Sequence, residues 1–471
     1  MRRPALALAL LLAAATFAAY LPLWRNDFVI LDDGAYVTEN PRVRAGLTPG
    51  GVAWALTAVR PWSWHPLTWL SHMTDVSLFG LDPRGHHATS LLLHAGCALL
   101  LFLILRSLTG WLWRSALAAA LLALHPIHVE TAAWVAERKG ALSSFLFLAA
   151  LLAYARYARR PGAGRLALVV AAAAASLMAK QMAVTLPAVL LLLDFWPLGR
   201  FRRPAGDATP ALRRALPLLA EKLPLLLLAA GAAAVALLTQ SRGGAVMELA
   251  AFPAAQRAGN ALVSYVAYLG AAAWPAKLAC FYPHPGAGLS LARAGAAAAL
   301  LAGVTALALA AARRRPWLLT GWLWYLATLV PVLGLVQIGW AARADRYAHL
   351  PLIGVYLALA AAAGELAGRA PRRRAAAGAA ALLLLAALGA ATWRQVGVWR
   401  DDLTLFEHDA AVTEANWFAH SNLGGAYLKR GRLDLATLHF REAVRLNRAF
   451  AIRPGAQRPP AGGGGAAGRG R

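Results

Sequence analysis

Two adjacent carboxylates, Asp32 and Asp33, follow the first long apolar stretch of the chain. A carboxyl group at the edge of an apolar environment is desolvated, and a second carboxyl beside it adds repulsion between like charges. Both effects raise a carboxyl pKa, so the pair has the chemistry of a general base near neutral pH. The Asp-Gly step that follows at Gly34 is equally typical of a solvated turn. From these residues alone, a catalytic base and a turn are both open.

The segment after this pair, residues 25 to 87, is rich in Trp and His and contains His65 and His87. Tryptophans so close to the membrane surface most simply form an interfacial aromatic belt, and the alternative is that they stack on a sugar. Histidines near carboxylates can bind a metal ion, but the chain has no tight spacing such as His-Glu-x-x-His. A divalent metal ion is therefore compatible with this segment and not required by it.

A second polar segment contains His128 and Glu130, which alternate with apolar residues. Four cations outside the main basic clusters could bind a phosphate, and they are Arg138, Lys139, Lys180 and Arg346. Few cations are expected on the outer side of a membrane, so a lipid phosphate is a natural anion for them. Structural salt bridges are the alternative for the cations near Glu130.

The composition places the chain in a membrane. Its 471 residues are 59% hydrophobic and carry a formal charge of +26. The arginines lie in short clusters between apolar blocks, which is typical of cytoplasmic loops and not of a nucleic-acid-binding face. With two cysteines, the chain has neither a disulfide framework nor a metal-binding cysteine cluster.

The apolar blocks predict an all-α polytopic membrane protein of about 11 transmembrane helices. They lie near residues 4–24, 88–105, 115–134, 141–157, 166–182, 184–199, 217–239, 291–312, 316–338, 347–366 and 375–393. We expect residues 260–278 to form an interfacial or re-entrant helix and not a span. All basic clusters then lie on one side of the membrane, the cytoplasmic side, together with the N-terminus. The candidate residues converge at the outer membrane surface in this topology.

The C-terminal part changes character after residue 400. We expect a connecting helix at 401–416, and 417–450 has the spacing of a single tetratricopeptide repeat on the outer side. One repeat cannot bury its own hydrophobic face, so either further repeats are missing or another protein segment docks on this face. Residues 451–471, rich in Pro, Gly and Arg, have the composition of a disordered tail. We interpret this tail as the frameshifted or truncated remnant of a longer repeat array.

To about residue 450, the chain resembles the bacterial relatives of the transmembrane and tetratricopeptide-repeat protein O-mannosyltransferases, which are type C (GT-C) integral-membrane glycosyltransferases. The residues that carry this resemblance are Asp32-Asp33, His125–Glu130, Glu137–Lys139, Lys180, Leu191–Arg200, Phe281–Pro285 and Ala344–Tyr347. The chain departs from the pattern at Gly140, where Asp often follows Arg-Lys, and at Gln181, where Pro is usual. The resemblance implies a GT-C-like transmembrane domain over residues 1–400.

Such enzymes take a sugar from a polyprenyl phosphate on the outer face, and an acidic residue of the first outer loop is the base. The resemblance implies this role for Asp33 or Asp32. The topology places the pair on the same face as the other candidate residues, and the resemblance then tips the balance toward Asp33 as the base, with Asp32 as its supporting partner. The resemblance also implies a mannose-like sugar, a protein or glycan acceptor and a location in the bacterial inner membrane. A membrane-anchored scaffold that has lost catalysis is the main alternative, and a transporter is a weaker third.

Overall fold

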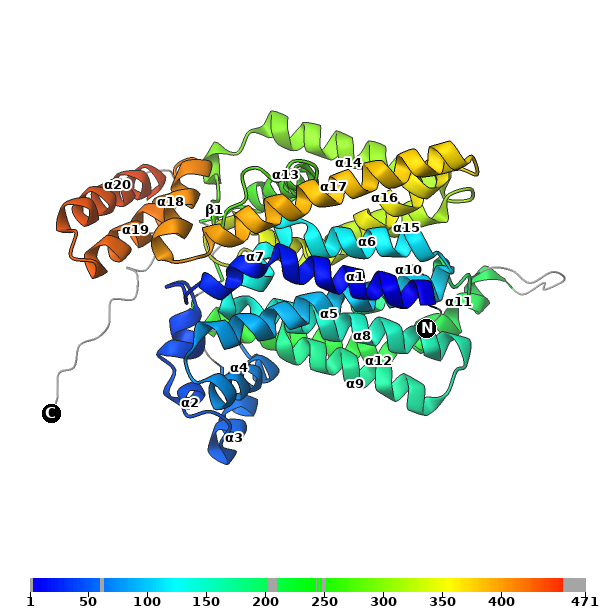
Figure 1. The fold of residues 1–471 in the computed structure, drawn as a ribbon, viewed down its shortest axis with the longest axis horizontal. Coiled ribbons are helices and arrows are strands. Elements are labelled where there is room, and N and C mark those ends of the chain that lie inside the picture. The colour runs from blue at the N-terminus through cyan, green and yellow to red at the C-terminus, as the bar shows by residue number, and fades with distance from the viewer. Residues whose placement is uncertain are drawn as a thin grey trace.

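The computed structural model describes residues 3–59, 63–201, 210–242, 244, 246–247 and 251–451, and these residues are almost entirely helical. Figure 1 shows the long helices running side by side, with α2, α3, α4 and the C-terminal helices at the end away from the N-terminus. The predicted tail lies, from residue 452 on, outside the described residues.

The bundle contains twelve of the described helices. They are α1 (Arg3–Ala19), α5 (Pro83–Thr109), α6 (Leu112–Leu124), α8 (Arg138–Arg159), α9 (Ala163–Ala179), α10 (Leu186–Phe195), α12 (Leu223–Arg242), α13 (Ala254–Ala273), α14 (Leu291–Ala311), α15 (Pro316–Leu329), α16 (Pro351–Ala367) and α17 (Pro371–Val398). Short helices lie between them, among them α7 (Val129–Ala133) and α11 (Ala211–Ala220). Each predicted apolar block therefore coincides with a helix of the bundle.

Six helical segments among the described residues are long and apolar enough to cross a membrane. They are Arg3–Arg25, Pro83–Thr109, Val135–Arg159, Leu223–Arg242, Leu291–Ala311 and Pro371–Val398. A pair bent by 55°, Leu112–Leu124 with Pro126–Ala133, makes a seventh if it is one span. The chain is therefore an integral membrane protein. The count of eleven stays a prediction, because α9, α10, α15 and α16 are shorter than a full span.

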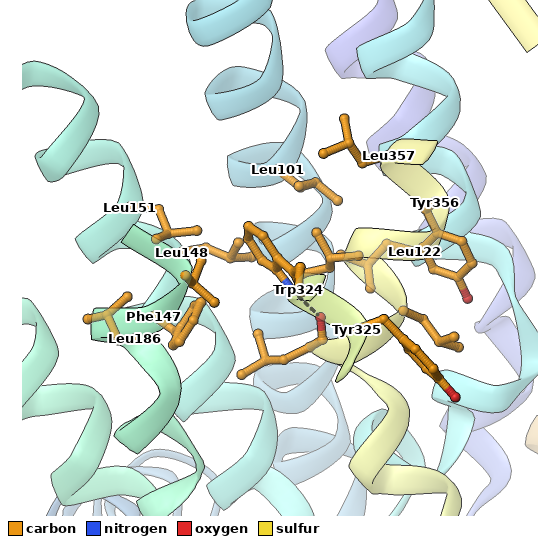
Figure 2. Close-up of a cluster of buried hydrophobic side chains, with 14 of the residues drawn as sticks. Leu101, Leu122, Phe147, Leu148, Leu151, Leu186, Trp324, Tyr325, Tyr356 and Leu357 are labelled. Carbon is orange, nitrogen blue, oxygen red and sulfur yellow. Dashed lines mark hydrogen bonds between the residues drawn. The ribbon is translucent and has the colours of Figure 1, made fainter. Parts of the chain in front are cut away.

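The largest apolar core lies where α5, α6, α8, α10, α15 and α16 meet (Figure 2). Trp324 lies at its centre, and its indole N–H donates to the carbonyl of Leu350 at 2.9 Å. α15 and α16 touch through their backbones, because a Cβ at Gly321 would lie 2.4 Å from the carbonyl oxygen of Gly354. Small residues at such crossings let membrane helices approach closely, which fixes the position of the segment before α16.

The predicted first outer loop forms a helical cap on one end of the bundle, made of α2 (Pro41–Arg44), α3 (Pro49–Thr57) and α4 (Pro66–Phe79) (Figure 1). A single π-helical turn, Gly34–Thr38, joins the cap to α1. Side-chain caps define the starts of α2 and α3, since Asn40 accepts from the amides of the first turn of α2 and Thr48 accepts from Gly51 N at 3.0 Å. The acidic pair thus lies where α1 passes into this cap.

Two short strands, β1 (Tyr282–Pro283) and β2 (Ala341–Arg343), pair in antiparallel fashion beside α13. The hydroxyl of Tyr268 on α13 donates to the carbonyl of Ala344 at 3.0 Å. α13 is not among the candidate spans, as the topology prediction for residues 260–278 requires. The strand pair departs from a purely helical chain, and it positions the residues that follow β2.

The C-terminal region contains α18 (Asp402–Val412) and an antiparallel pair, α19 (Trp417–Lys429) and α20 (Leu433–Ala451) (Figure 1). The pair packs closely, since a Cβ at Gly424 would lie 2.6 Å from the ring of Phe440. Asp409 on α18 accepts from the amide and the thiol of Cys280, at 3.1 and 2.8 Å. The expected connecting helix and helix pair are present and docked on the bundle, and their assignment to a tetratricopeptide repeat stays a prediction.

Candidate active site

Asp33 is buried beneath the turn that follows α1, with only 1% of its surface exposed. Its carboxylate accepts from Val29 N at 2.9 Å and from Ala136 N at 2.7 Å. Burial is the main effect on the pKa of Asp33 and raises it to about 7. The charge of Asp32 acts in the same direction, whereas the two backbone hydrogen bonds and the charge of Lys139 oppose the rise. Asp33 therefore ties the turn to the segment before α8, which brings the two predicted outer segments together.

The carboxylate of Asp32 has the opposite environment, because 43% of its side chain is exposed. Its Oδ2 lies 3.3 Å from Nζ of Lys139. The ammonium of Lys139 in turn lies over two aromatic rings, 4.5 Å from the centre of Tyr36 and 4.9 Å from that of Trp134. A substrate hydroxyl could reach Asp32 from solvent, and a phosphate near it would meet Lys139.

Three of the four predicted phosphate-binding cations converge on one buried carboxylate, that of Glu137. Lys180 forms an ion pair with its Oε1. Lys139 Nζ and Arg346 Nε lie 3.7 and 3.8 Å from its Oε2. The residues come from the start of α8, the end of α9 and the segment before α16, so the bundle assembles a cationic site from distant parts of the chain.

Arg346 is also bound by Glu130. The guanidinium of Arg346 lies 2.6 Å from Glu130 Oε1, and its backbone amide donates to Oε2 at 2.7 Å. Glu130 therefore forms a structural salt bridge, which was the alternative to phosphate binding for the cations near it. Glu137 was quoted above only as part of the family resemblance, and no role in the site was predicted for it. The signal that points to it is its place beside Arg138 and Lys139 in an outer segment rich in cations.

Arg138 does not join this cationic cluster. It is fully buried and forms an ion pair with Asp75 on α4. Its other hydrogen bonds go to the carbonyl of His86 at 2.6 Å, to Ser90 Oγ at 3.3 Å, and to the carbonyl and hydroxyl of Ser71 at 3.4 Å. Since these protein groups surround the guanidinium, the structure gives Arg138 the contacts of a structural residue and not those expected of a phosphate ligand.

His65 links the cap to the turn that follows α9. The amide nitrogen of Gln181 donates to the carbonyl of Trp64, so its Oε1 is the acceptor for His65 Nε2 at 3.0 Å. His65 Nδ1 then accepts from the hydroxyl of Tyr36 at 3.0 Å. Burial lowers the pKa of His65 to about 3, with Lys139 acting in the same direction, so the ring is neutral. Gln181, which departs from the family pattern, is thus the partner of a predicted site residue.

The other two predicted histidines contact different groups. His128 Nε2 shares a hydrogen bond of 2.9 Å with Tyr356 OH. The rings of His94, His125 and His349 have centres within 6.5 Å of the His128 ring. His87 is buried on α5 next to His86, in the surroundings of Arg138. Within the described part of the chain, no group of three or more His, Cys, Asp or Glu has the arrangement of a metal site.

A narrow cavity of about 10 Å³, which has room for about one water molecule, lies beside the cationic cluster. Its lining comprises Gly140, Ser143, Ser144, Lys180, Met182, Arg346, His349 and Leu350. Two cations and two hydroxyls therefore face the same space. A phosphate would fit between Lys180 and Arg346 only if these lining side chains moved apart.

Comparison with known proteins gives the relatives of this chain. The Drosophila melanogaster protein O-mannosyl-transferase Tmtc1 is 34% identical over 139 residues, which are 29% of this chain and 16% of that protein. The mouse protein O-mannosyl-transferase TMTC1 is 35% identical over 162 residues, 31% of this chain and 17% of that protein. The chain is similar to the TMTC protein O-mannosyltransferases. The resemblance to this family is thereby confirmed, and a bacterial origin stays a prediction.

The matched region is short relative to the TMTC proteins, since it spans less than a fifth of the fly and mouse proteins. The human TMTC4 protein matches over 221 residues at 26% identity, which are 41% of this chain and 30% of that protein. No family model matches the chain. A solved structure of ArnT from Cupriavidus metallidurans bound to undecaprenyl phosphate aligns with 95% of this chain and 76% of that chain, at 15% identity and a TM-score of 0.39.

Proposed function

We propose that this TMTC-like chain is a membrane glycosyltransferase that moves a mannose-like sugar from a polyprenyl phosphate to a hydroxyl group on the outer membrane face. The observation that carries the proposal is the pairing of an accessible carboxylate, Asp32, with Lys139 at 3.3 Å. Lys139 belongs to a cluster of three cations that shares the buried Glu137. This arrangement supports a proton acceptor beside a phosphate-binding site.

Asp32 is the better candidate for the base, which reverses the preference for Asp33 drawn from the family resemblance. A general base must come within hydrogen-bond reach of the hydroxyl it deprotonates. The carboxylate of Asp33 is 1% exposed and both of its oxygens already accept backbone hydrogen bonds, whereas the Asp32 side chain is 43% exposed. Asp33 then acts as a positioning residue, because it holds the turn that presents Asp32.

In the proposed reaction, the acceptor oxygen attacks the anomeric carbon and its proton passes to Asp32. The bond between that carbon and the phosphate oxygen breaks, and the polyprenyl phosphate leaves with the electron pair. Lys139, Lys180 and Arg346 stabilise the charge that develops on the phosphate. A positioned base contributes typically about 100-fold to 10,000-fold. The scheme needs no metal ion, because side chains supply the positive charge.

The names of the relatives support mannose as the sugar and a protein hydroxyl as the acceptor. The basic loops between the spans support an N-terminus on the cytoplasmic side and a C-terminal helix pair on the outer side. A bacterial inner membrane, with the helix pair in the periplasm, is part of the same proposal. Purified chain in lipid vesicles should transfer labelled mannose from polyprenyl-phosphate mannose and not from a nucleotide sugar. Transfer from the nucleotide sugar alone would overturn the proposed donor.

One observation favours a second candidate function, that of a membrane-anchored scaffold without catalysis. The α19–α20 pair exposes large apolar side chains, including Leu428, Leu433, Leu438 and Val444, each of which is about half exposed or more. Such a face suits a partner helix or a further repeat. A scaffold without catalysis tolerates loss of the exposed Asp32 carboxylate in cells, whereas the glycosyltransferase does not.

A further inference from the structure

The cationic cluster is already charge-balanced in the structure. Glu137 is fully buried, and its two oxygens face three cations from three parts of the chain. Counting the ion pairs around these cations, three positive groups face three carboxylates, which are Glu130, Glu137 and Asp32. A phosphate that binds Lys139, Lys180 and Arg346 must therefore enter a site in which a carboxylate already occupies the place of an anion.

The Glu137 carboxylate can lie against Lys180 because residue 140 is a glycine and has no side chain in the way. A Cβ at residue 140 would lie 2.3 Å from Glu137 Oε1 and 3.2 Å from its carboxyl carbon. The same Cβ would lie 3.5 Å from Nζ of Lys180. Any side chain at this position would push the carboxylate away from Lys180. The ion pair between Glu137 and Lys180 thus depends on the residue at which this chain departs from the family pattern.

We propose that Glu137 is a resident counter-ion of the donor site, which holds the three cations while the site is empty and gives way when the donor phosphate binds. This inference rests on the proposed glycosyltransferase function. A buried cation without a partner is strongly unfavourable, so an empty phosphate site of this kind needs an internal anion. The same anion then competes with the phosphate for Lys139, Lys180 and Arg346.

The competition has a use at the end of the reaction. The donor is a phosphodiester with one negative charge, whereas the leaving polyprenyl phosphate is a monoester that carries more. With Glu137 displaced, Lys139 and Arg346 keep Asp32 and Glu130, but Lys180 loses its carboxylate partner and the cluster gains a net positive charge. That charge would retain the product tightly, and binding the product as tightly as the transition state does not accelerate turnover. When the Glu137 carboxylate returns to Lys180, it helps to release the product. Glu137 touches no reacting atom and is a positioning residue.

Two variants of different chemistry test the proposal. Glu137→Gln removes the charge and keeps the shape, and Gly140→Ala keeps the charge and displaces the carboxylate. Both should bind undecaprenyl phosphate more tightly than the unchanged chain, by about tenfold, and both should show a lower kcat with a lower KM for the lipid donor. Glu365→Gln is a matched control, because it removes one carboxylate that pairs with Arg315 near the other end of α16.

The sign of the change in affinity decides between the proposal and a merely structural role. Binding of undecaprenyl phosphate to the purified full-length chain in nanodiscs measures it without any need for turnover. If Glu137 only holds the cations in place, Glu137→Gln weakens binding and raises KM, which would overturn the inference. Equal affinity of Gly140→Ala and the unchanged chain would also overturn it. No binding by the unchanged chain would instead overturn the proposed function itself, together with this inference.

Discussion

The buried pair of Arg138 and Asp75 gives a sharp prediction about which cations are structural. Arg138→Met replaces the guanidinium with an apolar side chain of similar length. Asp75 on α4, whose side chain is 3% exposed, then loses the guanidinium and keeps only the hydroxyl of Thr89, which donates to it at 2.8 Å, and the ring of His86 at 3.6 Å. The carbonyl of His86 also loses a donor at 2.6 Å. The cap and the start of α8 therefore lose this buried connection.

The expected cost follows from the burial of both charges. Removal of one partner from a buried ion pair costs about 3–5 kcal/mol, because the other charge stays desolvated. The double variant Arg138→Met with Asp75→Leu removes both charges and should recover most of this loss. Arg315→Met is the matched control, since it breaks an ion pair of 3.0 Å whose arginine is 59% exposed. Its expected cost is below about 1 kcal/mol.

Thermal and denaturant unfolding in detergent measures these differences, together with the KM for the lipid donor. The structural role predicts a large loss of stability in Arg138→Met and recovery in the double variant. If Arg138→Met unfolds like the unchanged chain and only raises the donor KM, then Arg138 is a phosphate ligand after all and the reasoning from its contacts is refuted.

Two further predictions concern the turn and the cap. The raised pKa of Asp33, about 7 against 3.8 for the free group, means that its contribution to stability is fully present below about pH 4 and is lost as the pH rises through 7. The Asp33→Asn variant has no carboxyl group to titrate, so it should lose this pH-dependent contribution, which amounts to at most roughly 4 kcal/mol. A difference in unfolding free energy between the variant and the unchanged chain that stays constant from pH 4 to 8 would contradict this. Gln181→Ala leaves the buried ring of His65 without one partner and should lower the unfolding free energy by about 1–3 kcal/mol, with no change in donor KM.

The helices were predictable because each apolar block has a local signature. Length and hydropathy act over about 20 neighbouring residues, so they find Pro83–Thr109 or Pro371–Val398 without knowledge of the fold. The strand pair was not predictable in this way. Tyr282 pairs with Arg343, and two or three residues far apart in the chain carry no period that a local pattern could reveal.

The site was predictable in its residue types and not in its contacts. Arg138 and Lys139 are neighbours in the sequence, which suggested one role for both. Successive residues on a helix point in different directions, so Arg138 faces Asp75 while Lys139 faces Asp32. The central place of Glu137 and the difference in exposure between Asp32 and Asp33 follow from tertiary packing, which no spacing in the sequence encodes.

The most direct test of the account compares Asp32→Asn with Asp33→Asn in the transfer of labelled mannose from polyprenyl-phosphate mannose, with membrane insertion checked for each. We predict that Asp32→Asn abolishes transfer while the protein still inserts and still binds undecaprenyl phosphate. Asp33→Asn should retain measurable transfer, because it acts through the position of Asp32. Full activity of Asp32→Asn would contradict the central claim that an accessible carboxylate beside Lys139 is the base.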